Sequence, residues 1–196
     1  MNGLKHIVFI LIIGFAYANN GCMDAEACNF DSEATADDGS CYYAEENHDC
    51  DGTPLEFQFI QTTQQAFYYF SSVTIENIEL NADDWVGAFN GDVCVGSRKW
   101  DLSQCGGGIC ECAAMGAELP GTEEYMSQGD IPTFKIYDAS ENIYYDAVIT
   151  GDITDDEGNI VSGAWSNFAF INIVLLEVNL PIPGCTDPDY CNYDPS

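Results

Sequence analysis

Apolar and polar residues alternate along the middle of the chain with the two-residue period of β-strands. In the first such segment, residues 55–61, the side chains of Leu55, Phe57 and Phe59 fall on one face. Further β-branched and aromatic runs, separated by turn residues, cover residues 66–80, 85–89, 93–97, 131–137, 144–149 and 165–178. No window shows the capped apolar stripe of an amphipathic helix. The pattern therefore predicts strands and turns rather than helices.

About eight short strands between residues 54 and 180 predict an all-β fold, an antiparallel β-sandwich with Greek-key-like connections. An up-and-down barrel is the alternative that the same pattern allows. The dipeptide Asn90-Gly91, between two of the runs, predicts a hairpin with a type I′ turn. Residues 101–130, rich in Gly and Cys, are expected to form a long loop region.

The first 18 residues have the features of a secretory signal peptide. Lys5 precedes a short apolar run, residues 7–15, and Ala16-Tyr17-Ala18 matches the small-residue cleavage rule, with the cut after Ala18. The apolar run is too short to cross about 30 Å of hydrocarbon as a helix. We expect a secreted protein, extracellular or at the cell surface, without membrane insertion.

The mature chain is predicted to have three parts. Residues 19–53 contain few aliphatic side chains and many Asp, Asn, Gly and Ser residues, so cysteines must hold this segment together. Residues 54–180 carry the predicted β-sandwich, and residues 181–196 contain a linker and the start of a second Cys- and Asp-rich repeat. The expected architecture is a β-sandwich flanked by small disulfide-rich loop modules.

The two ends of the mature chain share the motif G-C-x-D-x-x-x-C-N-[FY]-D. The motif begins at Gly21 in the first copy and at Gly184 in the second, with its Cys, Asp and Asn residues at identical spacing. The first copy continues through Asp37-Asp38-Gly39-Ser40-Cys41 to Cys50, whereas the second stops at Ser196. We interpret the chain as the truncated front of a longer repeat-bearing polypeptide; a natural short tail is the alternative.

Ten cysteines follow the predicted cleavage site, an even number that favours disulfides in an exported chain. They form three groups: Cys22, Cys28, Cys41 and Cys50; Cys94, Cys105, Cys110 and Cys112; Cys185 and Cys191. Spacing does not reveal the pairing within a group of four. A zinc site made of the four central cysteines is an alternative, but the paired C-x-x-C spacing typical of such sites is missing.

Acidic residues dominate the charged positions: 33 Asp and Glu face 4 Lys and Arg, which gives a formal net charge of −29. Such a chain repels nucleic acid and anionic membranes, so neither is expected as a partner. Adaptation to salty water and binding of Ca²⁺ are two compatible explanations for the acidity.

Residues 21–41, of the form G-C-x-D-x-x-A-C-N-[FY]-D-x-x-A-T-x-D-D-G-S-C, resemble a short repeat common in large secreted proteins of marine bacteria of the Bacteroidetes type. Residues 43–52 resemble what often follows that repeat, and residues 83–96 and 129–138 are similar to a β-module found between such repeats. The resemblance implies a multi-module surface or extracellular protein, often exported by type IX secretion. It implies no known reaction.

Oxygen-bearing side chains crowd the first repeat, within a loop that cysteines constrain. Ca²⁺ prefers about six to eight oxygen ligands from carboxylates, amides and backbone carbonyls. The candidate ligands are Asp24, Asn29, Asp31, Asp37 and Asp38, and the matching tail residues Asp187, Asn192 and Asp194 would form a second half-site. The alternative is that these side chains cap turns and solvate the loop. A further acidic loop, residues 152–159, is interpreted as a solvated loop.

No residue is predicted to be catalytic. After cleavage the chain keeps one histidine, His48, and it lacks a nucleophile elbow of the G-x-S-x-G type. Trp100 and Trp165 lie near predicted loops and are candidates for stacking on sugar rings, with burial in the core as the alternative.

These features predict a structural or adhesive module of an extracellular surface protein or fibre, stabilised by disulfides and Ca²⁺. The expected partners are other copies of the chain or neighbouring modules of a longer polypeptide. Residues 169–178 are a candidate strand for addition to a partner sheet. The alternative function is a carbohydrate-binding module that recognises a polysaccharide.

Overall fold

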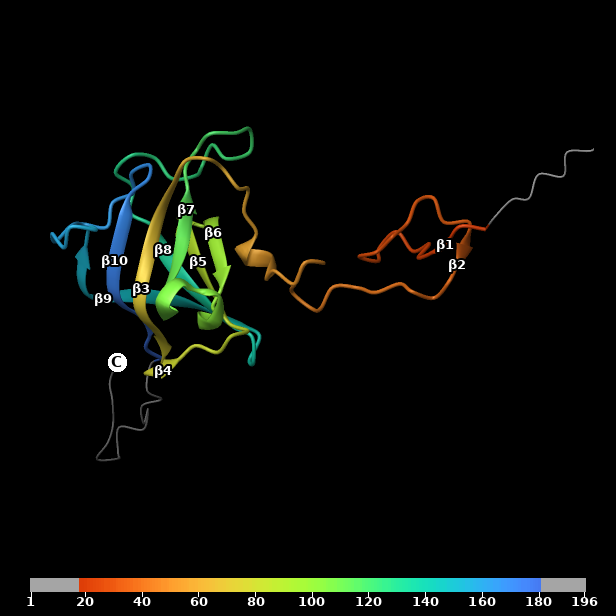
Figure 1. The fold of residues 1–196 in the computed structure, drawn as a ribbon, viewed down its shortest axis with the longest axis horizontal. Coiled ribbons are helices and arrows are strands. Elements are labelled where there is room, and N and C mark those ends of the chain that lie inside the picture. Colours follow the sequence, from red (N-terminus) through yellow and green to blue (C-terminus); the bar gives the residue numbers. More distant parts are fainter. Residues whose placement is uncertain (1–17, 181–196) are drawn as a thin grey trace, which may run out of the picture. The chain divides into compact units, whose positions relative to one another are not determined.

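The computed structural model describes residues 18–180. The chain divides between Thr53 and Pro54 into two compact units, which we name the Cys-rich unit, residues 18–53, and the β domain, residues 54–180 (Figure 1). Several predictions fall outside the described residues: the signal peptide up to residue 17, the tail cysteines Cys185 and Cys191, and the half-site of Asp187, Asn192 and Asp194.

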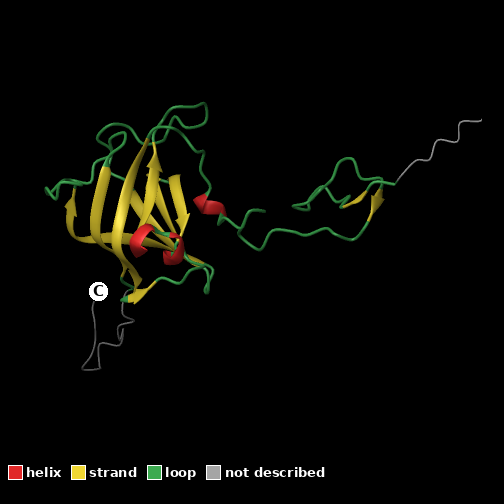
Figure 2. Ribbon diagram, viewed as in Figure 1, coloured by secondary structure: helices red, strands yellow, loops and turns green. Residues whose placement is uncertain are grey.

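Strands make up most of the regular structure of the β domain, and long loops connect them (Figure 2). The strands are β3 (Gln65–Ile75), β4 (Ile78–Glu79), β5 (Trp85–Asn90), β6 (Val93–Lys99), β7 (Cys110–Met115), β8 (Thr133–Asp138), β9 (Ile143–Thr154) and β10 (Phe170–Val178). Three short 3₁₀ turns lie outside the sheet: η1 (Leu55–Phe57), η2 (Leu102–Gln104) and η3 (Gly106–Gly108). The prediction of an all-β fold is confirmed.

The strands of the β domain form one eight-stranded sheet in the order β4-β3-β10-β9-β8-β5-β6, with β7 also paired to β3. Neighbouring strands run antiparallel except β10 and β3, which run parallel from the pair Phe170–Phe67 to the pair Val178–Ile75. The prediction of a purely antiparallel sheet is wrong at this pair. A parallel pair needs a long crossover, and the strands β4 to β9 provide it.

Strand β10 occupies an interior position in the sheet, between β3 and β9. Both of its edges are therefore paired within the chain. The prediction that residues 169–178 add as a strand to a partner sheet is wrong for this fold, because β-strand addition requires a free edge.

The sheet curls so that β3, β7 and β10 lie in front of β5, β6 and β8, which gives two layers around one core (Figure 1). In β3 the inward side chains Ala66, Tyr68 and Phe70 are buried and alternate with more exposed residues. The ring of Phe70 lies 5.1 Å from that of Phe134 and 5.9 Å from that of Trp100, measured between centroids. Aromatic rings from both layers thus share one core, as in a β-sandwich.

Strands β6 and β7 approach each other where the curled sheet nearly closes, a contact that we name the β6–β7 seam. Among the described strands no backbone ladder joins these two. Arg98 of β6 instead forms an ion pair with Glu111 of β7. A Cβ atom at Gly96 would overlap the carbonyl oxygen of Ala113, so the close approach of the two backbones requires glycine at this position.

Two predictions of local structure are wrong. Residues 55–61 begin with η1 and form no strand. The alternating pattern there reflects burial of the Phe57 side chain, whose ring packs against those of Phe89 and Tyr144. Part of the predicted loop 101–130 is strand β7. This strand alternates inward and outward residues but has no β-branched side chain, so composition gave no sign of it.

The hairpin of β5 and β6 is present, but its turn lies one residue later than predicted. Asn90 pairs with Val93, which leaves Gly91-Asp92 as the two-residue loop. Gly91 has a φ of 60°, and Asn90 and Asp92 do not have positive φ. Glycine with positive φ at the first loop position defines a type II′ turn, not type I′.

Candidate functional sites

Two interleaved disulfides hold the Cys-rich unit together. They join Cys22 to Cys41 and Cys28 to Cys50. The unit has only short parallel strands, β1 (Asn20–Gly21) and β2 (Ala36–Asp37), and among residues 18–53 only Cys22 and Ala27 are buried. Closing loops of 19 and 22 residues removes entropy from the unfolded chain, worth about 3 kcal/mol for each bond. Covalent bonds therefore replace a hydrophobic core in this unit.

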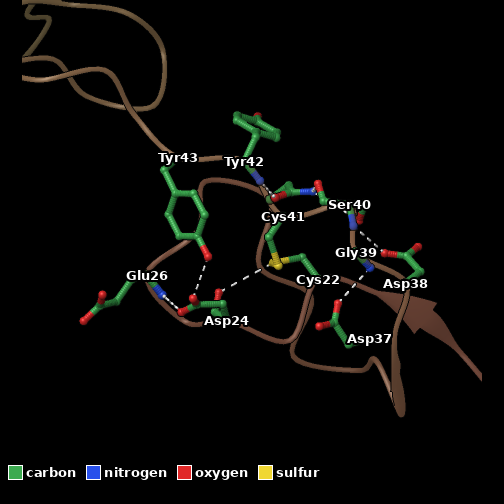
Figure 3. The surroundings of a disulfide bond; sticks show 11 residues. Cys22, Asp24, Glu26, Asp37, Asp38, Gly39, Ser40, Cys41, Tyr42 and Tyr43 are labelled. Atoms are coloured by element: carbon green, nitrogen blue, oxygen red, sulfur yellow. Dashed lines mark hydrogen bonds between the residues drawn. A yellow bond between two sulfur atoms is a disulfide. The ribbon is translucent and has the colours of Figure 1, made fainter.

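Asp24, one of the five predicted calcium ligands, joins two segments of the Cys-rich unit. Its carboxylate accepts the backbone N–H of Glu26 at 2.9 Å and the hydroxyl of Tyr43 at 2.7 Å, beside the Cys22–Cys41 disulfide (Figure 3). The Tyr43 hydroxyl, followed by the Glu26 N–H, lowers the pKa of Asp24. The bond links the two chain segments that the disulfide also joins, and it favours the ionised carboxylate.

The other predicted ligands also bond to backbone groups of their own loop. The carboxylates of Asp31, Asp37 and Asp38 each accept the N–H of the residue two positions later, at 2.8 to 3.0 Å. Asn29 joins two segments, because its amide donates to the carbonyl of Ser40 at 2.8 Å and accepts the N–H of Tyr42 at 3.0 Å. These contacts are the ones expected if the side chains cap turns of the backbone, which is the alternative to binding Ca²⁺.

The five side chains do not converge on one point. Within residues 18–180 no group of three or more His, Cys, Asp and Glu side chains is arranged to hold a metal ion. Calcium binding by Asp24, Asn29, Asp31, Asp37 and Asp38 stays a prediction, and the capping contacts explain these residue types without a metal. In the second acidic loop, Asp155 likewise accepts the N–H groups of Glu157 and Asn159.

The four central cysteines separate into one disulfide and two thiols. Cys105 pairs with Cys110, which rules out a zinc site of all four cysteines. Cys94 and Cys112 are buried and free, so the prediction that every cysteine is paired is wrong for these two. Their sulfur atoms lie 3.5 Å and 3.7 Å from the carbonyl oxygen of Gly96 in the β6–β7 seam. Burial raises the pKa of Cys94 to about 11 and raises that of Cys112 further, which makes both thiols unreactive.

The two tryptophans proposed for sugar stacking are both in the core. Trp100 is 2% exposed and Trp165 is 3% exposed. The indole N–H of Trp165 donates to the carbonyl of Ala114 at 2.9 Å, and Trp100 packs against Phe70. The stacking prediction is wrong for these residues because both indoles are buried in the core of the β domain, out of reach of a ligand.

Three other aromatic residues lie on the outer face of the sheet. Phe67 and Tyr69 of β3 and Phe170 of β10 occupy positions that alternate with the buried ones. The rings of Phe67 and Phe170 are 5.3 Å apart with 16° between their planes, and those of Tyr69 and Phe170 are 6.4 Å apart with 15°. We name these residues the outer aromatic strip. Its side chains are half-buried or, for Phe170, 43% exposed.

Two shallow hollows flank the outer aromatic strip. One, of about 260 Å³, is lined by Phe67 together with Gln61, Gln65 and Glu111. The other, of about 460 Å³, is lined by Phe170 together with Asp155, Asp156, Ser166 and Phe168. Because Phe67 and Phe170 stack on each other, the strip connects the two hollows.

Sequence analysis missed the outer aromatic strip although a signal was present. Both faces of β3 carry aromatic residues, with Tyr68 and Phe70 inward and Phe67 and Tyr69 outward. A solvated strand face is normally polar, so a strand that is aromatic on both faces is unusual for an antiparallel sheet. Composition alone did not show which of the two faces meets solvent.

Comparison of the chain with models of protein families, with curated proteins and with solved structures finds no match. Among the described residues no helix is long and apolar enough to span a membrane. The three disulfides within residues 18–180 and the small β domain are consistent with an extracellular module.

Proposed function

We propose that the chain is a non-catalytic adhesive module of an extracellular protein, in which the outer face of the β domain makes the adhesive contact. The observation that carries the proposal is the outer aromatic strip. Three adjacent aromatic rings lie on the outer face of the β3–β10 pair, where soluble sheets usually present polar side chains. Clustered apolar surface of this kind is typical of interaction sites.

The Cys-rich unit supports the structural half of the proposal. Two interleaved disulfides hold it without a core, so it acts as a short covalently braced spacer. The resemblance of residues 21–41 to a repeat of bacterial surface proteins agrees with this role. In a longer chain, such spacers would separate neighbouring β domains.

Adsorption of the oxidised mature protein to coated sensor surfaces tests the proposal. The surfaces carry alkyl chains, a film of neutral polysaccharide, or the protein itself. The double variant Phe67→Ser with Phe170→Ser removes the strip, and Ile160→Ser is the matched control because Ile160 is 75% exposed and lies outside the strip. We expect the double variant to lose about tenfold or more of the adsorbed mass on at least one surface, while the control retains it.

Equal adsorption of wild type, control and double variant on all three surfaces would overturn the adhesive role of the strip. Thermal unfolding of each protein excludes misfolding as the cause of any loss. Because Phe67 and Phe170 face outward, serine at these positions is expected to leave the core contacts of Phe70 and Ile171 in place.

A further inference from the structure

We propose that the outer aromatic strip and its two flanking hollows bind a neutral polysaccharide chain. The inference rests on the proposed adhesive function and names the chemical class of its ligand. Sugar rings present C–H groups on their faces and hydroxyl groups around their rims, so their binding sites combine aromatic side chains with hydrogen-bonding groups. The strip supplies the aromatic side chains, and the hollows supply the hydrogen-bonding groups.

The ring geometry suits a ligand with repeating units. The planes of Phe67 and Tyr69 each lie within about 16° of the plane of Phe170, so the three rings share nearly one orientation. Because neighbouring rings stack against each other, the strip offers one extended apolar surface across two strands, which a polymer can cover with the C–H groups of successive sugar units. Phe168, 60% exposed, extends the aromatic surface on the side of the larger hollow.

The polar groups around the strip suit a ligand that donates hydrogen bonds. Asp155 and Asp156 are among the residues that line one hollow, and Gln61, Gln65 and Glu111 are among those that line the other, so each hollow has side chains with oxygen acceptors. Sugar hydroxyl groups are donors to such oxygens. Hydrogen bonds between a hydroxyl group and a carboxylate are stronger than those between two neutral groups.

The electrostatic character of the site excludes anionic polymers. Among the described residues that line the two hollows, Arg98 is the one cationic side chain, and its charge is already paired with Glu111. The whole chain carries a formal net charge of −29. A sulfated or carboxylated polysaccharide would therefore meet repulsion without a free cation to bind it, whereas a neutral chain would not.

Binding of oligosaccharides to the oxidised mature protein tests the inference. The probes are hexasaccharides of neutral glucan, mannan, xylan and galactan, with carboxylated alginate and sulfated carrageenan fragments as anionic counterparts. We expect at least one neutral probe to bind and the anionic probes to fail. Calorimetry gives the affinity, and nuclear magnetic resonance shows which residues are perturbed.

Two substitutions at the same position separate ring stacking from simple apolar contact. Phe170→Leu keeps an apolar side chain but removes the aromatic ring, and it is expected to weaken binding of the neutral probe about tenfold. Phe170→Tyr keeps the ring and is expected to bind within about twofold of wild type. Because Phe170 is 43% exposed, both variants are expected to fold, which thermal unfolding verifies.

The inference fails if no neutral probe binds, if an anionic probe binds more tightly than every neutral one, or if Phe170→Leu binds as wild type does. These outcomes differ from failure of the proposed function. A protein that adheres to alkyl or protein surfaces through the strip but ignores neutral sugars retains the adhesive function and loses only the assignment of its ligand.

Discussion

The repeat motif of the Cys-rich unit can be explained residue by residue through backbone contacts. Gly21 leaves room for Asp31, because a Cβ atom added at Gly21 would lie 3.1 Å from the Asp31 carboxylate oxygen. Gly39 adopts a φ of 73°, which favours glycine. Asn29 uses both ends of its amide to join Ser40 and Tyr42. These glycine, aspartate and asparagine residues therefore each satisfy a backbone group or a steric limit in a unit that has no hydrophobic core.

The bond between Asp24 and Tyr43 makes the Cys-rich unit sensitive to acid. The pKa of Asp24 is lowered in the folded chain, so the carboxylate contributes stability above the ordinary pKa of aspartate. This contribution to stability is lost as the pH falls through the lowered pKa of Asp24. In Tyr43→Phe the main cause of the shift is removed, so we predict that the Asp24 titration midpoint, measured by carboxyl nuclear magnetic resonance, rises toward 3.8.

The neighbouring Asp38 serves as an internal control, because its pKa is lowered by Ser40 and its contacts do not involve Tyr43. We expect its titration midpoint to be the same in wild type and in Tyr43→Phe. If the midpoint of Asp24 is also the same in the two proteins, the hydroxyl of Tyr43 does not bond to that carboxylate in solution.

At the scale of secondary-structure elements, the β6–β7 seam decides how the sheet closes. The two strands meet without a backbone ladder, so close packing at Gly96 and the Arg98–Glu111 ion pair hold them together. The buried thiols of Cys94 and Cys112 lie against the same carbonyl group of Gly96. The seam is thus closed by side chains and by one glycine, whereas ladders join the other neighbouring strands of the sheet.

We predict that Gly96→Ala destabilises the β domain by about 3 kcal/mol or more, because the methyl group collides with backbone that cannot move as a side chain does. The matched control is Gly106→Ala, since no atom lies near a Cβ at Gly106 and its φ is not positive. Urea unfolding of both variants gives the free energies. A loss at Gly96 no larger than that at Gly106 would show that the two strands do not approach this closely.

The sequence predicted strands well where β-branched or aromatic residues alternate, as in β5, β6, β8 and β9. It failed for β7, which pairs through its backbone but is built from Cys, Glu, Ala and Met. It also failed for residues 55–61, where Phe57 and Phe59 alternate as in a strand but no neighbouring strand is available. Periodicity reports which side chains are buried and does not report whether a backbone partner exists.

The candidate sites show the same limit. Sequence grouped Cys22, Cys28, Cys41 and Cys50 correctly, yet the interleaved pairing depends on a chain path that spacing does not determine. Trp100 and Trp165 stand beside loops in the sequence but lie in the core, where Trp100 packs against Phe70 and Trp165 donates to the carbonyl of Ala114. The outer aromatic strip is formed by β3 and β10, which a crossover of residues 76–169 brings together.

At the scale of the whole molecule, the two units are stable for different physical reasons. The β domain has one extensive core and a single short disulfide loop, Cys105–Cys110. The Cys-rich unit depends on two disulfides for its structure. A reducing environment would therefore unfold the Cys-rich unit and leave the β domain folded, which is consistent with a protein that works outside the cell.

The central claim is that the β domain makes the adhesive contact and that the Cys-rich unit is a disulfide-braced spacer. Force spectroscopy tests this claim directly. The mature chain is held by its N-terminus and brought into contact with the surface that adsorbs it best. We predict that a reductant lengthens the extension before detachment by about 70 Å, because the 22-residue loop between Cys28 and Cys50 is released at about 3.3–3.6 Å per residue, less the 5.3 Å that the disulfide already spans. We also predict that the variant with Phe67→Ser and Phe170→Ser rarely attaches. Equal extension with and without reductant, or equal attachment of the variant and wild type, would contradict the account.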